Sequence, residues 1–189
     1  MSDDIKDTSF VRSNTNAHLK RWCALPNPYP EPRVLRPNHN YALILLEDYA
    51  GSVSELTAIN QYFYHYLTFE EKYENLAELE ECISIIEMYH LELLGKTIQM
   101  LGLPPKYWTL NNNRPTFWNA SYVCYGKDVC DRLFADIAAE EKAIKQYRLH
   151  QKMIDDPYIK ELLERIIMDE EHHLQLFRQA AAVHCPDVK

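Results

Sequence analysis

The feature that most constrains this chain is an internal repeat of polar and apolar residues at helical spacing. The segments that begin at Glu55 (ELTAINQY) and Glu140 (EEKAIKQY) are identical at five of eight positions. An E-x-x-H tetrad follows about 30 residues after each of these glutamates. The two tetrads contain Glu87 with His90 and Glu170 with His173. One such tetrad is a weak signal, but the same order twice predicts two halves with matching roles.

Hydrophobic spacing and capping signals predict four helices of about 25 residues each. Asn75 (with Glu78 as its capping-box partner), Asp128 and Asp156 are expected to cap the last three helices at their N-termini. Gly102 and Pro104 are expected to end the second helix. The expected ranges are 41–68, 75–101, 129–154 and 157–182.

The lengths of the connections predict the topology of these helices. Short loops near 69–74 and 155 favour two antiparallel hairpins, whereas residues 102–128 are long enough to return along a helix of about 37 Å. The expected fold is therefore all-α, a four-helix bundle with one long crossover between helices two and three. The crossover's aromatic residues are expected to pack on the bundle surface. They are Tyr107, Trp108, Phe117, Trp118, Tyr122 and Tyr125.

Residues 1–40 differ in composition from the bundle domain expected at 41–189. Five prolines lie between positions 26 and 37. Proline lacks a backbone N–H and disfavours helix before it, so this stretch should run extended. We expect a Pro-rich N-terminal arm that is either mobile or laid across a neighbouring subunit.

The four repeated glutamates are expected to meet in one layer of the bundle. At 1.5 Å per residue, each lies about 18–21 Å from its connecting turn. His90 and His173 follow Glu87 and Glu170 by one helical turn on the same faces. Four buried carboxylates repel one another, and two divalent cations would balance their charge. Oxygen and nitrogen ligands without sulfur suit iron or manganese.

This ligand set matches the carboxylate-bridged di-metal plan of helical bundles. In that plan Glu87 and Glu170 bridge the metals, and one histidine binds each ion. Glu55 and Glu140 are then terminal ligands.

The chain resembles the ferritin-like superfamily, with the closest similarity to bacterioferritin and rubrerythrin-type di-iron proteins. The similarity covers about 41–180 and is carried by ELTAINQYF from Glu55, by Glu87-Met-Tyr-His90 and by DEEHH from Asp169. It implies oxygen or peroxide chemistry at a di-iron or di-manganese centre. The crossover and the arm are unlike a simple ferritin subunit, and no C-x-x-C rubredoxin module follows.

The resemblance also implies roles for residues near the ligands. The hydroxyls of Tyr62 and Tyr147 are expected to bond the ligand carboxylates of the opposite hairpin. Asp136 or Asp169 is a candidate to accept the free ring N–H of a ligand histidine and fix its tautomer. Met88 stands where bacterioferritin places its haem-ligating methionine; we expect an ordinary packed methionine there and no haem.

These observations predict a di-metal oxidoreductase acting on hydrogen peroxide or dioxygen. Peroxidase, ferroxidase and manganese catalase chemistries share this ligand layer, so the sequence does not separate them or name an electron donor. One alternative is an iron storage or buffering protein. Another is a structural, coat-type protein that uses the metals as staples. A homodimer is expected from the aromatic content and from the habit of the family.

Charge and cysteine usage exclude several other classes. The net charge of −8 disfavours nucleic acid and anionic membrane as partners, and no apolar run is long enough to span a bilayer. The five cysteines are scattered and form no C-x-x-C pair. We expect reduced thiols in a cytoplasmic protein, and the acidic, polar start does not resemble a secretory signal.

Overall fold

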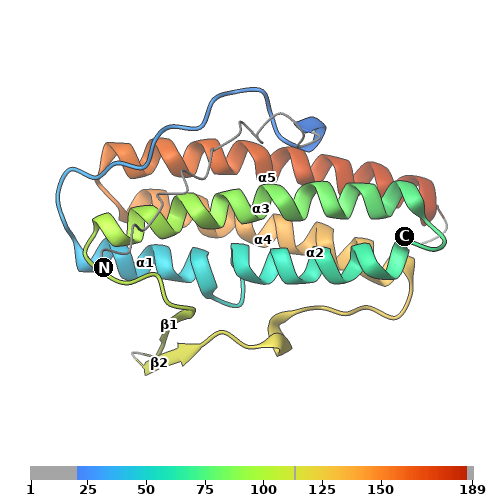
Figure 1. The fold of residues 1–189 in the computed structure, drawn as a ribbon, viewed down its shortest axis with the longest axis horizontal. Helices are drawn as coiled ribbons and strands as arrows, with labels where there is room; N and C mark the ends of the chain where they lie inside the picture. The colour runs from blue at the N-terminus through green and yellow to red at the C-terminus, as the bar shows by residue number, and fades with distance from the viewer. Residues whose placement is uncertain (1–20, 113, 187–189) are drawn as a thin grey trace, which may run out of the picture.

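Long helices lie side by side in two hairpins (Figure 1). The structure, a computed structural model, describes residues 21–112 and 114–186. The first hairpin pairs α2 (Glu55–Phe69) with α3 (Glu74–Met100), and the second pairs α4 (Val129–Met153) with α5 (Pro157–His184). The crossover between the hairpins runs back along the bundle, so α3 and α4 point in the same direction. The predicted all-α bundle with one long crossover is confirmed.

The first predicted helix is in fact two helices. α1 (His39–Ala50) ends at Gly51, and α2 begins after a break of four residues. A Cβ atom at Gly51 would lie 2.5 Å from the carbonyl oxygen of Glu47, so the close backbone approach requires glycine. Ser54 then caps α2 by accepting a hydrogen bond from Thr57 N at 3.2 Å. The break makes Glu55 the first residue of α2.

The other helix ends follow the capping signals, with one exception. Asp128 and Asp156 each accept two backbone N–H groups at the starts of α4 and α5, as predicted. Gly102, with φ of +100°, follows the end of α3. The prediction of Asn75 as an N-cap is wrong, because α3 begins at Glu74 and its N-cap residue Tyr73 makes no side-chain capping bond.

The crossover contains a small hairpin of β1 (Trp108–Asn111) and β2 (Arg114–Phe117), followed by a 3-10 turn, η3 (Ala120–Tyr122). The strands pair antiparallel, with Trp108 opposite Phe117. The indole N–H of Trp118 donates to Thr57 Oγ1 at 2.9 Å and fastens the crossover to α2. Packing on the bundle is only partial for the other aromatic residues, since Phe117 is 68% exposed and Tyr107 50% exposed.

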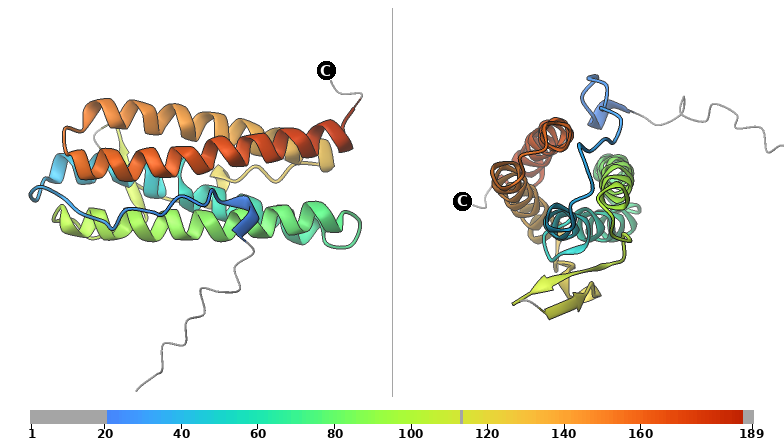
Figure 2. Two further views of the ribbon diagram at one scale, coloured as in Figure 1. Left: turned by 90° about the horizontal axis from the view of Figure 1, so that it is seen from above. Right: turned by 90° about the vertical axis from the view of Figure 1, so that its left-hand side faces the viewer.

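The described part of the N-terminal arm lies on its own bundle. After a 3-10 turn, η2 (Arg21–Cys23), residues 24–38 run along the seam between α3 and α5 (Figure 2). Leu25 N donates to Asp169 Oδ1 at 2.9 Å, and Leu35 N donates to Asp156 at 2.6 Å. This part of the arm is therefore neither detached nor free to lie elsewhere. Residues 1–20 of the predicted arm are outside the described ranges.

The expectation that all five cysteines are reduced thiols is wrong, because four of them form two disulfides. Cys23 is bonded to Cys82 of α3, and Cys130 of α4 is bonded to Cys185 beyond α5. Only tertiary packing brings these pairs together, because their partners are 59 and 55 residues apart. Cys124 is a free, exposed thiol.

Two apolar clusters fill the bundle, one toward each end. Leu45, Leu94 and Ile166 belong to the cluster around α1, and Ile83, Leu133 and Phe177 belong to the cluster near the α2–α3 loop.

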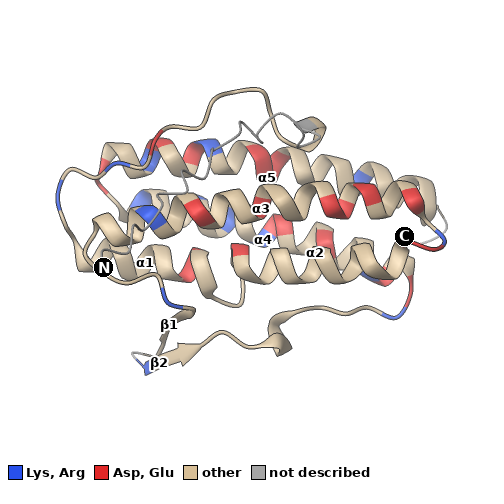
Figure 3. Cartoon of the chain, in the orientation of Figure 1, with Lys and Arg blue, Asp and Glu red and all other residues tan. Residues whose placement is uncertain are grey.

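Acidic positions recur along the helices with basic positions between them (Figure 3). In the described ranges, no helix has the length and apolarity needed to cross a bilayer.

A buried ion pair fastens α1 to α4 and makes stability depend on pH. His150 Nδ1 lies 2.8 Å from Asp48, whose Oδ1 also accepts from Gln146 at 2.8 Å. Burial opposes protonation of His150, but its hydrogen bonds to Asp48 and Glu47 outweigh burial and raise its pKa from 6.5 to about 9. A raised histidine pKa stabilises the fold fully below pH 6.5, and this stabilisation is lost as the pH rises through 9.

Asp48→Asn should therefore destabilise the protein in a pH-dependent way. We expect the variant to lose about 1–2 kcal/mol of unfolding free energy at pH 6 and less than half of that at pH 9.5. Urea unfolding at both pH values measures the difference. An equal loss at both values would contradict the ion pair.

Candidate metal centre

The six predicted ligands lie in one buried layer between the two apolar clusters. α2 contributes Glu55, α3 Glu87 and His90, α4 Glu140, and α5 Glu170 and His173. None of these side chains is more than 3% exposed. They form two overlapping groups of four, in each of which the potential ligand atoms lie within 4.8 Å of one another. Glu87 and Glu170 belong to both groups.

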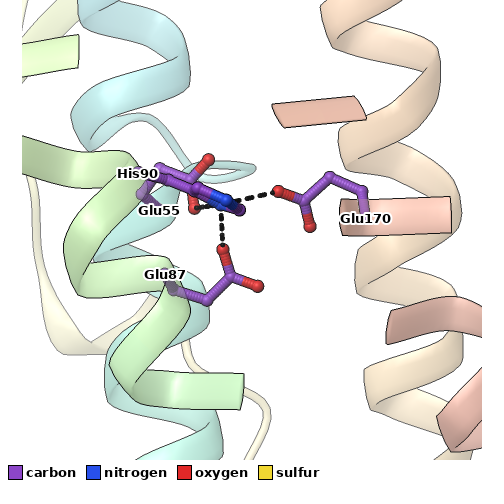
Figure 4. Close-up of side chains that lie close together, drawn as sticks. All are labelled: Glu55, Glu87, His90 and Glu170. Carbon is purple, nitrogen blue, oxygen red and sulfur yellow. Dashed lines mark hydrogen bonds and ion pairs between the residues drawn. The ribbon is translucent and has the colours of Figure 1, made fainter. Parts of the chain in front are cut away.

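The histidines define two poles of the layer. His90 Nδ1 lies 2.9 Å from Glu87 Oε2, 3.1 Å from Glu170 Oε1 and 3.9 Å from Glu55 Oε2 (Figure 4). His173 Nδ1 lies 2.9 Å from Glu87 Oε1, 3.5 Å from Glu170 Oε2 and 3.9 Å from Glu140 Oε1. Glu87 and Glu170 thus direct one oxygen toward each histidine. Glu55 lies near His90, and Glu140 lies near His173.

The layer fits two divalent cations. Glu87 Oε1, Glu170 Oε1 and His173 Nδ1 are buried atoms without a hydrogen bond, although each faces the layer. Unsatisfied buried polar atoms are costly, and a metal ion at each pole would satisfy them. Each pole offers one imidazole nitrogen and carboxylate oxygens only, which suits manganese or iron. Four carboxylates balance two doubly charged ions.

The pKa values of the side chains in the layer are shifted in different directions. Burial and the neighbouring carboxylates of Glu87 and Glu170 raise the pKa values of Glu55 and Glu140 well above the ordinary glutamate value. Burial acts the same way on Glu87, but the imidazoles of His173 and His90 outweigh it and hold its pKa low. Burial disfavours the charged form of His173, yet contacts with Glu87 and Glu170 raise its pKa to about 9. Cations that enter the layer therefore displace protons from it.

Two tyrosines cross between the hairpins. Tyr62 of α2 donates its hydroxyl to Glu140 Oε1 at 2.6 Å, and Tyr147 of α4 donates its hydroxyl to Glu55. Both rings are buried. Glu55 and Glu140 are thus each bound by a tyrosine from the opposite hairpin. These are the two contacts that the family resemblance implied.

Asp169 lies behind His90. Its Oδ2 is 3.2 Å from His90 Nε2 and 2.7 Å from Arg165 Nη1, and Tyr29 of the arm donates its hydroxyl to the same carboxylate. Because Asp169 accepts from Nε2, the Nδ1 atom of His90 is left to face the carboxylates. Tyr29 and Arg165 are not among the residues predicted from the sequence. Arg165 stands one helical turn before Asp169, a spacing that could have suggested the pair, whereas Tyr29 had no local signal.

Asp136 and Met88 differ from their sequence-based expectations. The carboxylate of Asp136 contacts Gln61 and His65, and neither ligand histidine hydrogen-bonds to it, because α4 directs this residue toward α2. Met88 is 48% exposed on α3, so it is not a packed core residue.

A cavity of about 200 Å³ reaches the layer between α2 and α4. Its lining includes Glu55, Glu140 and Glu170 of the layer together with the small residues Ala58, Ala139 and Ala143. The opposite seam, between α3 and α5, is covered by the arm. A small polar molecule therefore has a route to the carboxylates from the α2–α4 side.

Comparisons with known proteins agree with this geometry. The family described as "Manganese containing catalase" matches residues 29–104. A bacterioferritin from Streptomyces coelicolor is 33% identical over 125 residues, which cover 64% of this chain and 69% of that protein. The chain belongs to the ferritin-like superfamily of di-metal proteins.

Two further relatives of this ferritin-like protein are manganese catalases by name. A probable manganese catalase from Clostridium acetobutylicum is 28% identical over 169 residues, covering 78% of this chain and 73% of the relative. The crystal structure of KatB, a manganese catalase from Anabaena, superposes with a TM-score of 0.76 at 27% identity. That superposition covers 84% of this chain and 78% of KatB.

Proposed function

We propose that this protein is a di-metal oxidoreductase that disproportionates hydrogen peroxide, with two manganese ions held by the six-residue layer. Glu87 and Glu170 would be shared by both ions, His90 and Glu55 would bind one, and His173 and Glu140 would bind the other. The observation that carries the proposal is the pair of poles, each with one imidazole nitrogen and the same two shared carboxylates.

The reaction balances without an external electron donor. Two molecules of hydrogen peroxide give two of water and one of dioxygen, because one peroxide is reduced while the other is oxidised. The bound metals would supply the exchange of two electrons with the oxygen–oxygen bond. The similarity to manganese catalases favours this chemistry over a peroxidase, which needs a reductant.

The chain's own residues prepare the site for this reaction. The cavity, of about 200 Å³ and lined by Glu55 and Glu140, would admit a small substrate such as hydrogen peroxide. Tyr62 and Tyr147 hold these two carboxylates in position. Asp169 orients the imidazole of His90, while the arm covers that side of the site. Burial and the neighbouring carboxylates raise the pKa values of Glu55 and Glu140, so these two groups would release protons as they bind the metals.

Oxygen measurements test the proposed activity directly. Manganese-loaded protein should release one dioxygen per two peroxide molecules with no reductant present. Peroxide loss only in the presence of a reductant would indicate a peroxidase instead. Oxygen uptake on addition of ferrous iron, the activity that the bacterioferritin relatives make the second candidate, would also overturn the proposal.

The arm and the assembly belong to the same proposal. We infer that residues 41–189 form the catalytic bundle and that residues 21–38 act as its cover, in a homodimer. Light scattering should give twice the mass of 22.3 kDa, and a large hollow assembly would favour iron storage.

The two disulfides do not support the expectation of a cytoplasmic protein, because that expectation depended on reduced thiols.

Tyr62→Phe should separate the orienting role of this hydroxyl from metal retention. We expect both ions to remain bound and peroxide turnover to fall about 10-fold, because Glu140 loses the bond that orients it. Elemental analysis and oxygen release measure the two effects. Tyr66→Phe is the control, since the hydroxyl of Tyr66 is remote from the layer and donates to Glu70 at 3.3 Å. Equal turnover in the two variants would contradict the role.

A further inference from the structure

A second buried polar cluster lies in the same bundle, nearer the α2–α3 loop. His65 of α2, Glu80 of α3 and Asp136 of α4 are each fully buried. Their potential ligand atoms lie within 4.8 Å of one another. Glu80 precedes Glu87 by seven residues, which places this cluster about 10 Å along the helix from the catalytic layer. Neither the activity nor the substrate route uses these residues.

The imidazole of His65 presents a lone pair to the cluster. Its Nε2 lies 2.8 Å from the carbonyl oxygen of Cys124, which can only accept, so Nε2 carries a hydrogen. Its Nδ1 lies 2.9 Å from Asp136 Oδ1. Two electron-pair donors at this separation need a cation between them, either a proton or a metal ion. His90 has the same arrangement in the catalytic layer, with Nε2 on an acceptor and Nδ1 on carboxylates.

Glu80 adds a second buried carboxylate, so the single proton between His65 and Asp136 does not balance the charge of the cluster. Neither carboxylate oxygen of Glu80 has a hydrogen bond, although both are buried. Asp136 is held in place by Gln61, which donates to Oδ1 at 2.8 Å. Burial and the carboxylate of Asp136 raise the pKa of Glu80 well above its usual value, so without a metal ion Glu80 would have to carry a further proton. A buried charge without a partner is strongly unfavourable.

The duplicated half of the chain provides an internal comparison. The repeat extends to Gln61 and His65 in α2 and to Gln146 and His150 in α4, and Asp48 contacts the second pair as Asp136 contacts the first. Leu163 stands seven residues before Glu170, where Glu80 stands before Glu87. The His150 cluster therefore lacks this buried acid, and one proton balances its charge. Glu80 is the addition that distinguishes the His65 cluster.

We propose that His65 Nδ1 and the carboxylates of Glu80 and Asp136 bind a third divalent metal ion. One imidazole and two carboxylates suit manganese, iron or zinc. Such an ion would satisfy both oxygens of Glu80 and replace the proton between His65 and Asp136. The site is separate from the catalytic pair, since it shares no residue with it.

Metal stoichiometry tests this proposal. The full chain is dialysed against Mn²⁺ and analysed for bound metal, and its crystals are measured at the manganese absorption edge. We expect three ions per chain, with an anomalous peak among His65, Glu80 and Asp136. Glu80→Gln and His65→Gln should each retain two ions, with both catalytic peaks present.

Matched controls make the loss specific. Glu81→Gln removes an exposed acid next to Glu80, and His150→Gln makes the same change in the duplicated half; both should retain three ions. Circular dichroism confirms that each variant is folded. Two ions per chain in the wild type, with no peak at the cluster, would overturn the proposal and indicate a shared proton. Loss of all three ions in Glu80→Gln would overturn it too, because the sites would not be separate. Failure of the proposed activity would appear independently, as missing oxygen release.

Discussion

Replacing Glu87 by glutamine should remove both catalytic metals and nearly all peroxide turnover. Glu87 directs one oxygen to each histidine, at 2.9 Å in both cases, so a single change weakens both poles. Glutamine keeps the size of the side chain but removes the charge and one acceptor. We expect a loss of at least about 10³-fold in turnover, equivalent to about 4 kcal/mol in the barrier. Oxygen release and elemental analysis measure the two losses.

Glu81→Gln on the same helix is the matched control for this prediction. Glu81 is exposed, so its replacement should leave metal content and turnover unchanged. His173→Ala should lose the pair as Glu87→Gln does, and both variants should keep at most the ion of the His65 cluster. Full retention of the catalytic metals in either variant would defeat the ligand assignment.

Arg165→Leu should produce the largest loss of stability. Arg165 is 4% exposed, and its guanidinium lies 2.7 Å from Asp169 and donates to the carbonyl oxygens of Leu25 and Asn27 at 2.9 Å. Leucine fills part of the space but removes the arginine charge beside the buried Asp169 carboxylate and the donors to the two carbonyl groups. Removal of one member of a buried ion pair costs about 3–5 kcal/mol. For a protein of this size the melting temperature should fall by about 10 °C.

Arg178→Leu separates this effect from the loss of a surface charge. Arg178 lies on the same helix and pairs with Glu141 at 2.7 Å, but both side chains are substantially exposed. Exposed ion pairs contribute about 0–1 kcal/mol, so the control should melt within about 3 °C of the wild type. Thermal unfolding measures both variants, and protease digestion at residues 24–38 should be faster only in Arg165→Leu. Equal melting temperatures would show that Arg165 does not fasten the arm.

The catalytic layer was readable from the sequence because its residues repeat at fixed helical spacing. Each residue of a helix advances about 1.5 Å along its axis, so residue number gives the distance from the connecting turn. On this basis the four repeated glutamates could be assigned to one level of the bundle before their packing was known. The same property made Asp128 and Asp156 predictable as caps, since a cap depends only on neighbouring residues. The break at Gly51 was missed because the apolar pattern continues through it, and the close approach to Glu47 is visible only in three dimensions.

Long-range contacts were not readable in this way. Nothing near Tyr29 indicates that it reaches Asp169, which is 140 residues away, and nothing near Cys23 indicates Cys82. Glu80 is one of many glutamates on α3, and only its complete burial beside Asp136 and His65 distinguishes it. The duplicated sequence by itself determined the two helical hairpins, the common depth of the six candidate ligands and the charge that they require. The tertiary structure decided which seam the arm covers, which side stays open to substrate and which polar residues share a second site, because these depend on packing between segments that have no fixed spacing along the chain.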